Sequence, residues 1–67
     1  MKKVTLKEVK KGEYFTLKPI EEPTYRQVYV RDDYDRVTKK YTYYNFADVN
    51  RYGEKKGTTC VYIDFTF

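Results

Sequence analysis

Alternation of polar and apolar side chains with a period of two is the feature that most limits what this chain can fold into. The segment 58–67, TTCVYIDFTF, alternates over its whole length, and the segment 13–17, EYFTL, does the same. Successive side chains of a strand point to opposite faces, so this period is typical of strands with one buried face. The apolar side chains on these faces are Phe15 and Leu17 in one segment and Val61, Ile63, Phe65 and Phe67 in the other. The sequence therefore predicts a mainly β protein.

Two central segments form a predicted hairpin. Segments 27–35 and 39–46 are both rich in strand-forming residues, and a turn fits between them near residues 36–38. A three-residue turn sets the register of the pair. The facing residues are then Val28 with Phe46, Val30 with Tyr44, Arg31 with Tyr43, and Asp35 with Lys39.

The inner and outer faces of this hairpin follow from Phe46. This side chain has no polar group, so we expect it to point inward. The period of two then puts Tyr44 inside, and Tyr41 and Tyr43 outside. The predicted core is Phe15, Leu17, Val28, Val30, Tyr44, Phe46, Val61, Ile63 and Phe65.

The N-terminal segment TLKEVKKGEYF predicts one short helical turn. Thr5 can cap it, Glu8 stands three residues later as in a capping box, and Gly12 can take the left-handed conformation that ends a helix. Leu6 and Val9 would then fill the core.

Two segments are expected to be loops, and they complete the predicted architecture. Segment 18–26 contains both prolines, and segment 47–57 is charged and contains Gly53 and Gly57. We therefore expect a single small β domain over residues 1–67. Its predicted fold is a small curved antiparallel sheet, or an SH3-like or OB-like barrel of four to five strands, with one short N-terminal helical turn.

Length and cysteine content predict the size of the core and the cellular environment of the domain. A domain of 67 residues buries only about 60% of the surface that its unfolded chain exposes, so its core is small. Cys60 is the single cysteine and cannot form an intramolecular disulfide, which favours a reducing, cytoplasmic setting. No apolar run approaches the roughly 20 residues that span a bilayer, so we expect no membrane partner.

The charge of the chain favours an anionic partner. Fourteen Lys and Arg residues against ten Asp and Glu residues give a net charge of +4, which favours polyanions. Two basic runs could contact a phosphate backbone, although solvated lysines are the more common outcome. They contain Lys7, Lys10, Lys11, Lys55 and Lys56.

The residue types that are missing argue against an enzyme. The chain has no histidine and no serine, so neither a Ser-His-Asp nor a Cys-His arrangement can be built within it. Asp32, Asp33 and Asp35 lie close together, but the further ligands of a calcium loop are missing downstream. We expect no catalytic residue, no metal site and no cofactor.

A row of tyrosines beside basic residues is the predicted binding surface. If Phe46 points inward, five tyrosines gather on the outer face of the sheet. Rings that stack on bases, next to cations that contact phosphates, are typical of proteins that bind single-stranded nucleic acid. Single-stranded DNA or RNA is therefore the first predicted partner. The candidate contacts are Tyr14, Tyr29, Arg31, Lys39, Lys40, Tyr41, Tyr43 and Tyr62.

Two other interpretations of the same row stay open. Cross-strand aromatic pairs can serve only to stabilise a small sheet. Aromatic residues and arginine also mark protein interfaces, so the alternative function is a protein-interaction or inhibitor module. Its partner would be another protein, or a second copy of the chain paired along an edge strand.

Three blocks of the sequence carry a resemblance to other proteins. The blocks RDDYDRVTKKY, NFADVNR and DFTF resemble small uncharacterised open reading frames of gut-bacterial phages and mobile elements, over roughly residues 5–67. The resemblance implies no catalytic or binding residue. It implies an origin in a phage or mobile element, where small proteins often bind DNA or disable a host protein by contact. The segment VKKGEYF separately resembles the beginning of many small β-barrels.

Overall fold

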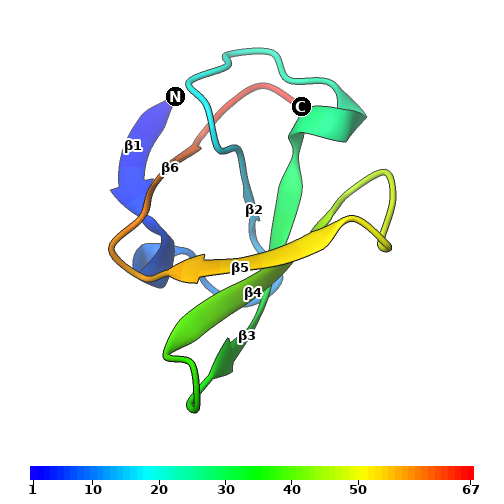
Figure 1. Ribbon diagram of the computed structural model, residues 1–67. Helices are drawn as coiled ribbons and strands as arrows, with labels where there is room; N and C mark the ends of the chain where they lie inside the picture. Colours follow the sequence, from blue (N-terminus) through cyan, green and yellow to red (C-terminus); the bar gives the residue numbers. More distant parts are fainter.

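Six strands and two 3-10 turns make up the computed structural model, which describes residues 1–67 (Figure 1). The strands are β1 (Lys2–Thr5), β2 (Tyr14–Phe15), β3 (Tyr29–Asp35), β4 (Lys40–Asn45), β5 (Tyr52–Lys56) and β6 (Cys60–Ile63). The turns are η1 (Leu6–Glu8) and η2 (Tyr25–Gln27). The mainly β class is confirmed, with six strands in place of four to five. Neither 3-10 turn has the length or the apolar character of a membrane-spanning helix.

The strands form two antiparallel sheets. One pairs β1 with β6, and the other has the order β2-β3-β4-β5. Thr16 and Tyr62 bridge the sheets through two backbone hydrogen bonds of 2.9 and 3.0 Å. On the opposite side, the N–H of Lys7 donates to the carbonyl of Gly57 at 3.1 Å, which ties η1 to the end of β5. The prediction allowed either an open curved sheet or a small barrel. The sheets do not close into a barrel, so the structure shows the open alternative.

The predicted N-terminal turn is confirmed, except for the residue that ends it. The hydroxyl of Thr5 donates to Glu8 Oε1 at 2.7 Å, and the Thr5 N–H donates to the same oxygen at 3.3 Å. These two hydrogen bonds lower the pKa of Glu8 below its ordinary value. Leu6 and Val9 are buried, as expected. Gly12 has the expected left-handed φ of 87°, but it does not end the helix, because η1 ends at Glu8 and its C-cap is Val9.

The main core lies between the two sheets. Tyr43 is its centre on the four-stranded side, where its ring packs edge-on against Phe15 and Tyr29 with centroid distances of 5.6 and 5.3 Å. The buried members of the core are Val4, Leu6, Val9, Phe15, Tyr43 and Val61. We call the face of the four-stranded sheet that carries Tyr43 the inner face, and the opposite face the outer face.

The prediction of which β4 side chains point inward is wrong. Tyr43 is only 8% exposed, whereas Phe46 is 39% exposed. The reason lies on the neighbouring strand, where Gly53 faces Tyr43 and leaves room for its ring. A Cβ atom at residue 53 would lie 2.9 Å from the Tyr43 hydroxyl oxygen. Tyr43 and Tyr41 therefore point to the inner face, and Tyr44 and Phe46 to the outer face.

The predicted register of the hairpin is confirmed near its start and wrong near its turn. Val30 faces Tyr44 and Arg31 faces Tyr43, as expected. A β-bulge between Arg31 and Tyr34 then shifts the pairing, so that Asp35 faces Lys40 and not Lys39. The turn consequently has four residues, 36–39, and Lys39 adopts a positive φ of 60°.

The rest of the predicted core divides between the two faces. Phe15 and Val61 are buried in the main core, and Leu17 and Ile63 pack against it. Val28 and Val30 are also buried, but on the outer face, because Val30 pairs with Tyr14 while Phe15 pairs with Tyr29. Tyr44 and Phe65 are only half-buried.

Three segments differ from their predicted secondary structure. Segment 47–57, expected as a loop, contains β5, and the N-terminus contributes the unexpected strand β1. β6 ends at Ile63 because Asp64 has a φ of 58° and breaks the alternation. The tail then turns toward the loop before η2, where the Thr66 N–H donates to the Glu21 carbonyl at 2.9 Å. The C-terminus lies beside η2 (Figure 1).

The burial of Tyr43 predicts a specific alkaline sensitivity. Burial raises the pKa of Tyr43 above its ordinary value of 10.0, and the nearby Tyr29 raises it further. A raised pKa means that the folded state favours the protonated phenol of Tyr43. The contribution of this phenol to the free energy of unfolding is therefore complete below about pH 10, and it is lost as the pH rises through the pKa of the folded state. We expect Tyr43→Phe to lose less stability than the wild type between about pH 8 and pH 11, by urea unfolding. Identical losses in both proteins would contradict this account.

Candidate functional site

The candidate contacts predicted from the sequence do not form one outer row. Tyr43 is buried in the core, and Tyr29 is half-buried against Phe15 and Tyr43 on the inner face. Tyr41 also points inward. The predicted row of exposed tyrosines is therefore wrong, because the prediction exchanged the inner and outer side chains of β4.

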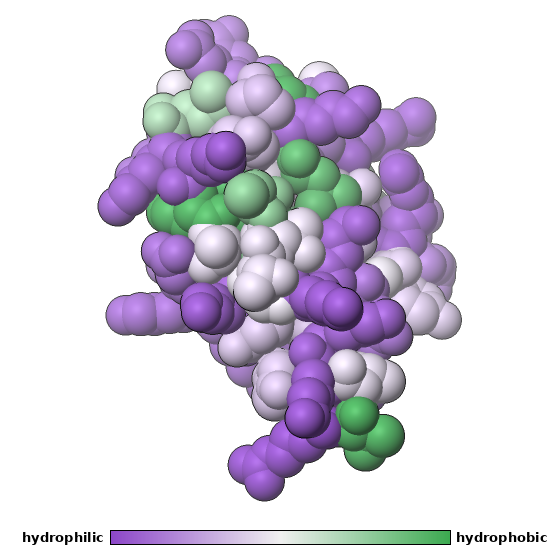
Figure 2. All heavy atoms as spheres, turned by 60° about the vertical axis from the view of Figure 1, so that its left-hand side comes forward, coloured by the Kyte–Doolittle hydropathy of each residue, from purple (hydrophilic) through white to green (hydrophobic).

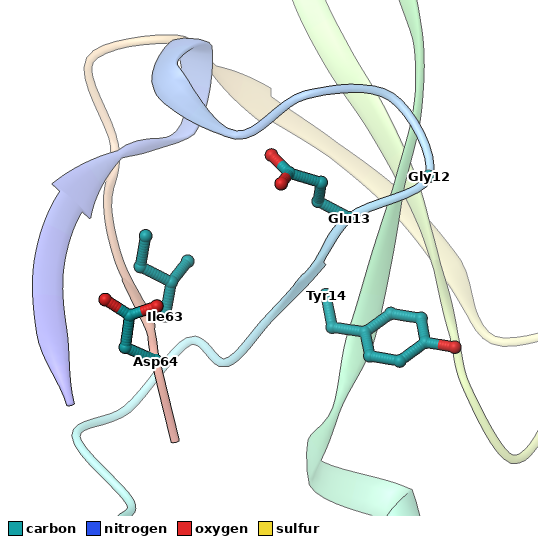
Figure 3. Close-up of a pocket in the computed structure, with 5 residues that line it drawn as sticks. All are labelled: Gly12, Glu13, Tyr14, Ile63 and Asp64. Atoms are coloured by element: carbon teal, nitrogen blue, oxygen red, sulfur yellow. The ribbon is translucent and has the colours of Figure 1, made fainter. Parts of the chain in front are cut away.

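Tyr14 and Tyr62 lie apart from the others. The ring of Tyr14 points away from the hollow that its backbone helps to line, as Figure 3 shows, and meets Phe46 at a centroid distance of 5.4 Å on the outer face. Tyr62 belongs to β6 in the two-stranded sheet and faces Lys3.

The structure does bring three of the predicted residues together, at the free end of the hairpin. Tyr41 lies beneath the guanidinium of Arg31, whose Cζ is 4.5 Å from the ring centroid. Tyr34, on the facing strand, packs against Tyr41 with the ring centroids 4.7 Å apart and the planes tilted by 49°. Lys39 stands in the adjoining turn. This end of the hairpin projects below the rest of the protein (Figure 1).

These residues line a hollow formed by three separate segments. We call it the hairpin hollow; its lining residues are Lys7, Tyr34, Thr38, Lys39, Tyr41, Lys56, Gly57 and Thr58. Gly57 is required there, because a Cβ atom at this position would lie 2.8 Å from the Tyr41 ring and 3.0 Å from the Cβ of Lys7. The glycine thus lets η1 and β5 approach the ring of Tyr41 closely.

The charge around the hairpin hollow is mainly positive. Lys55 faces Tyr41 across the strands, and Lys40 lies between Asp35 of β3 and Lys56 of β5. The direct pairing of Lys40 with Lys56 is unfavourable for folding, since like charges on facing residues repel. Figure 2 shows hydrophilic side chains on both sides of a pale band of weakly polar surface that runs toward the hairpin end.

The predicted contact Lys40 belongs to this end of the hairpin, while Tyr34 was missed. The bulge after Arg31 brings Tyr34 to the face of Tyr41, and no local pattern in RDDYD reveals a bulge. Lys7, Lys55 and Lys56 were visible in the sequence only as basic runs, so their convergence depends on the fold.

The acidic run near the hairpin has structural partners. Lys11 Nζ and Asp33 Oδ1 form an ion pair at 2.7 Å, which raises the pKa of Lys11 and lowers that of Asp33. Thr42 Oγ1 bonds to both the N–H and the carbonyl of Asp33 at 3.0 Å, which stabilises the bulge. Asp35 Oδ1 accepts the N–H of Val37 at 2.9 Å and stabilises the turn.

A second hollow carries a different charge. Its lining residues are Gly12, Glu13, Tyr14, Ile63 and Asp64, drawn in Figure 3. Two carboxylates border it, and Glu13 Oε1 already accepts the N–H of Lys10 at 2.8 Å. Its lining offers no cation to an anionic ligand and no nucleophile next to a base.

The pairing of Lys40 with Lys56 predicts a substitution that stabilises the fold. Lys56→Glu replaces a like-charge pair by an opposite-charge pair, and we expect the free energy of unfolding to rise by about 0.2–1 kcal/mol. Lys56→Gln removes only the repulsion and should give a smaller increase. Urea unfolding of the three proteins measures this. A Lys56→Glu protein less stable than the wild type would show that the two lysines do not repel each other.

The hairpin hollow therefore combines two rings with lysines from three segments. Arg31 does not line the hollow, but its guanidinium lies on the ring of Tyr41. Such a surface suits a ligand with flat aromatic groups next to anionic groups. Comparisons with protein-family models, with curated proteins and with solved structures find no match to this chain.

Proposed function

We propose that the hairpin hollow binds single-stranded nucleic acid and performs no catalysis. The observation that supports this most is that Lys7, Lys39 and Lys56 line the same hollow as Tyr34 and Tyr41. Lys55 in addition faces Tyr41 across the strands. Proteins that bind single strands combine the same two parts, since bases stack on rings while cations neutralise phosphates. In this proposal a base stacks on Tyr34, which is 44% exposed, and the adjacent phosphates contact the lysines.

Arg31 adds a flat cation to the proposed site. Its guanidinium is held on the ring of Tyr41, a geometry that also offers an outer surface for stacking. The Nε atom of Arg31 is buried and has no hydrogen-bond acceptor in the protein. A phosphate or base oxygen could therefore bond only to the terminal nitrogens of the guanidinium.

Two arguments favour single strands over duplex DNA. Bases inside a duplex stack on one another, so their faces are not accessible to a tyrosine ring. Duplex recognition by a helix in the major groove also needs a helix, and the helical segments here, η1 and η2, have three residues each.

A protein-interaction role is favoured by a different surface. The outer face of the sheet carries exposed rings of Tyr14, Tyr25 and Phe46. These residues are separate from the hairpin hollow, so the two roles do not compete and can be tested with different variants.

Binding should depend on both salt and Tyr34. Four phosphate contacts, from Lys7, Lys39, Lys55 and Lys56, would make the affinity for a single strand fall about 50-fold between roughly 50 and 200 mM salt. Tyr34→Ala should cost about 1–3 kcal/mol of binding free energy, the contribution of one stacked base. Fluorescence anisotropy with a labelled single-stranded DNA, an RNA and a duplex of the same sequence measures both effects.

Tyr52→Ala is the matched control, because Tyr52 is 80% exposed and lies on the outer face. It should bind as the wild type does. Lys56→Glu should weaken binding and reduce the salt dependence by about one phosphate contact, although it stabilises the fold. The proposal fails if no single strand binds at low salt, or if Tyr34→Ala and Tyr52→Ala have equal effects.

A further inference from the structure

Two arginines line a hollow at the opposite end of β5 from the hairpin hollow. We call it the arginine hollow; its lining residues are Arg26, Asn45, Ala47, Asp48 and Arg51. Arg26 belongs to η2, and Arg51 lies in the loop directly before β5. Figure 1 shows η2 and this loop toward the start of β5, whereas η1, which borders the hairpin hollow, lies at the end of the strand. The two hollows therefore border the same strand at its two ends.

A buried asparagine holds the two arginine segments together. Asn45 has no exposed surface. Its Nδ2 donates to the carbonyl of Arg26 at 2.8 Å, and its N–H donates to the carbonyl of Arg51 at 2.8 Å. Its Oδ1 accepts the N–H groups of Ala47 and Asp48 at 3.0 and 3.2 Å. Both polar atoms of this side chain thus bond to the backbone, which fixes the two segments relative to each other.

The guanidinium groups of Arg26 and Arg51 have no anionic partner in the protein. Both residues are exposed, and the single ion pair of the protein lies elsewhere. Asp48 lines the same hollow, but its Oδ1 accepts the N–H of Asn50 at 3.0 Å within the loop. A guanidinium presents its N–H donors in a flat fork that matches the oxygens of a phosphate. The arginine hollow therefore offers two unpaired forks to a phosphate group.

The inner row of β5 connects the two hollows. Gly53 points to the inner face, where it faces Tyr43. Lys55, two residues later, points the same way and is half-buried. Arg51 comes two residues before Gly53 and continues this row, since side chains of a strand repeat with a period of two. Gly53 has no side chain and is only half-buried, so no β5 side chain stands between Arg51 and Lys55.

The spacing of the two hollows fits a short single strand. Residues 51–55 span about 14 Å, at about 3.4 Å for each residue of an antiparallel strand. A stacked single strand carries one phosphate about every 3.4 Å along its axis, so about four nucleotides cover this span, and fewer when the strand is extended. OB folds, which are also small β domains, bind about 4–16 nucleotides. A strand that reaches both hollows would therefore have an ordinary length for a domain of this size.

We propose that the arginine hollow binds a further phosphate of the strand whose base stacks in the hairpin hollow, so that the nucleic acid runs along the inner side of β5. This path rests on the single-strand binding proposed above for the hairpin hollow. Lys55 lies between the two hollows and neutralises the intervening phosphates. Arg26 and Arg51 hold the strand at the start of β5.

The length of the oligonucleotide tests this path. Fluorescence anisotropy compares a labelled oligothymidylate of about three nucleotides, which is too short to reach both hollows, with one of about eight, which spans them. Arg26→Gln and Arg51→Gln should each weaken the binding of the longer strand about tenfold, as expected for the loss of a charged hydrogen bond, and leave the shorter strand unchanged. Glutamine keeps the backbone carbonyls that bind Asn45, so both variants should fold.

Two further variants control for charge alone. Lys18→Gln removes one positive charge from an exposed residue just after β2, on the opposite edge of the sheet, and should leave the binding of both strands unchanged. Asp48→Asn removes the negative charge from the arginine hollow and keeps an oxygen for the N–H of Asn50. It should strengthen the binding of the longer strand only.

Tyr34→Ala distinguishes a failure of this path from a failure of the hairpin hollow. If Tyr34→Ala weakens binding while both arginine variants bind the longer strand as the wild type does, the hairpin hollow is the binding site and the path along β5 is wrong. Equal effects of Arg51→Gln and Lys18→Gln, or equal effects of Arg51→Gln on the two lengths, also overturn the path. If neither strand binds at low salt, both proposals fail.

Discussion

The packing of Tyr43 into the core is the interaction on which the two surfaces of this protein depend. Its ring lies against Phe15 and Tyr29, over the space left by Gly53. Once Tyr43 points inward, the pleat of β4 sends every second side chain to the outer face. Phe46 consequently joins the exposed rings there, and Tyr41 points toward the inner face at the open end of the hairpin.

The same constraint gives the sheet two faces with different chemistry. On the inner face, the core ends before the hairpin does, so the rings of Tyr34 and Tyr41 extend beyond it and meet lysines from η1 and β5. On the outer face, the rings of Tyr14 and Tyr25 pack against Phe46. Rings beside cations favour a polyanion, and rings beside rings favour an apolar partner. One hairpin thus gives a small domain two faces of different chemistry.

Local patterns in the sequence predicted local structure well. The capping box of Thr5 and Glu8 is present as expected, because its two partners are three residues apart. The inward position of Tyr43 was not predictable in the same way, since it depends on Gly53 of another strand, in a segment that resembled a loop. For the candidate site, the sequence predicted tyrosines beside basic residues, but it placed the tyrosines on the wrong face of the sheet. The bulge that brings Tyr34 to Tyr41 has no signature in the sequence, and neither does the convergence of distant lysines.

Mapping a bound single strand onto the fold tests the central claim most directly. Amide chemical shifts from NMR, followed during titration with a short single-stranded oligonucleotide, report which residues the ligand affects. The account predicts the largest changes at Tyr34, Lys39, Tyr41, Lys56 and Gly57, with Tyr14 and Tyr52 on the outer face little affected. Changes confined to the outer face, or no changes at low salt, would contradict the assignment of the hairpin hollow as the binding site.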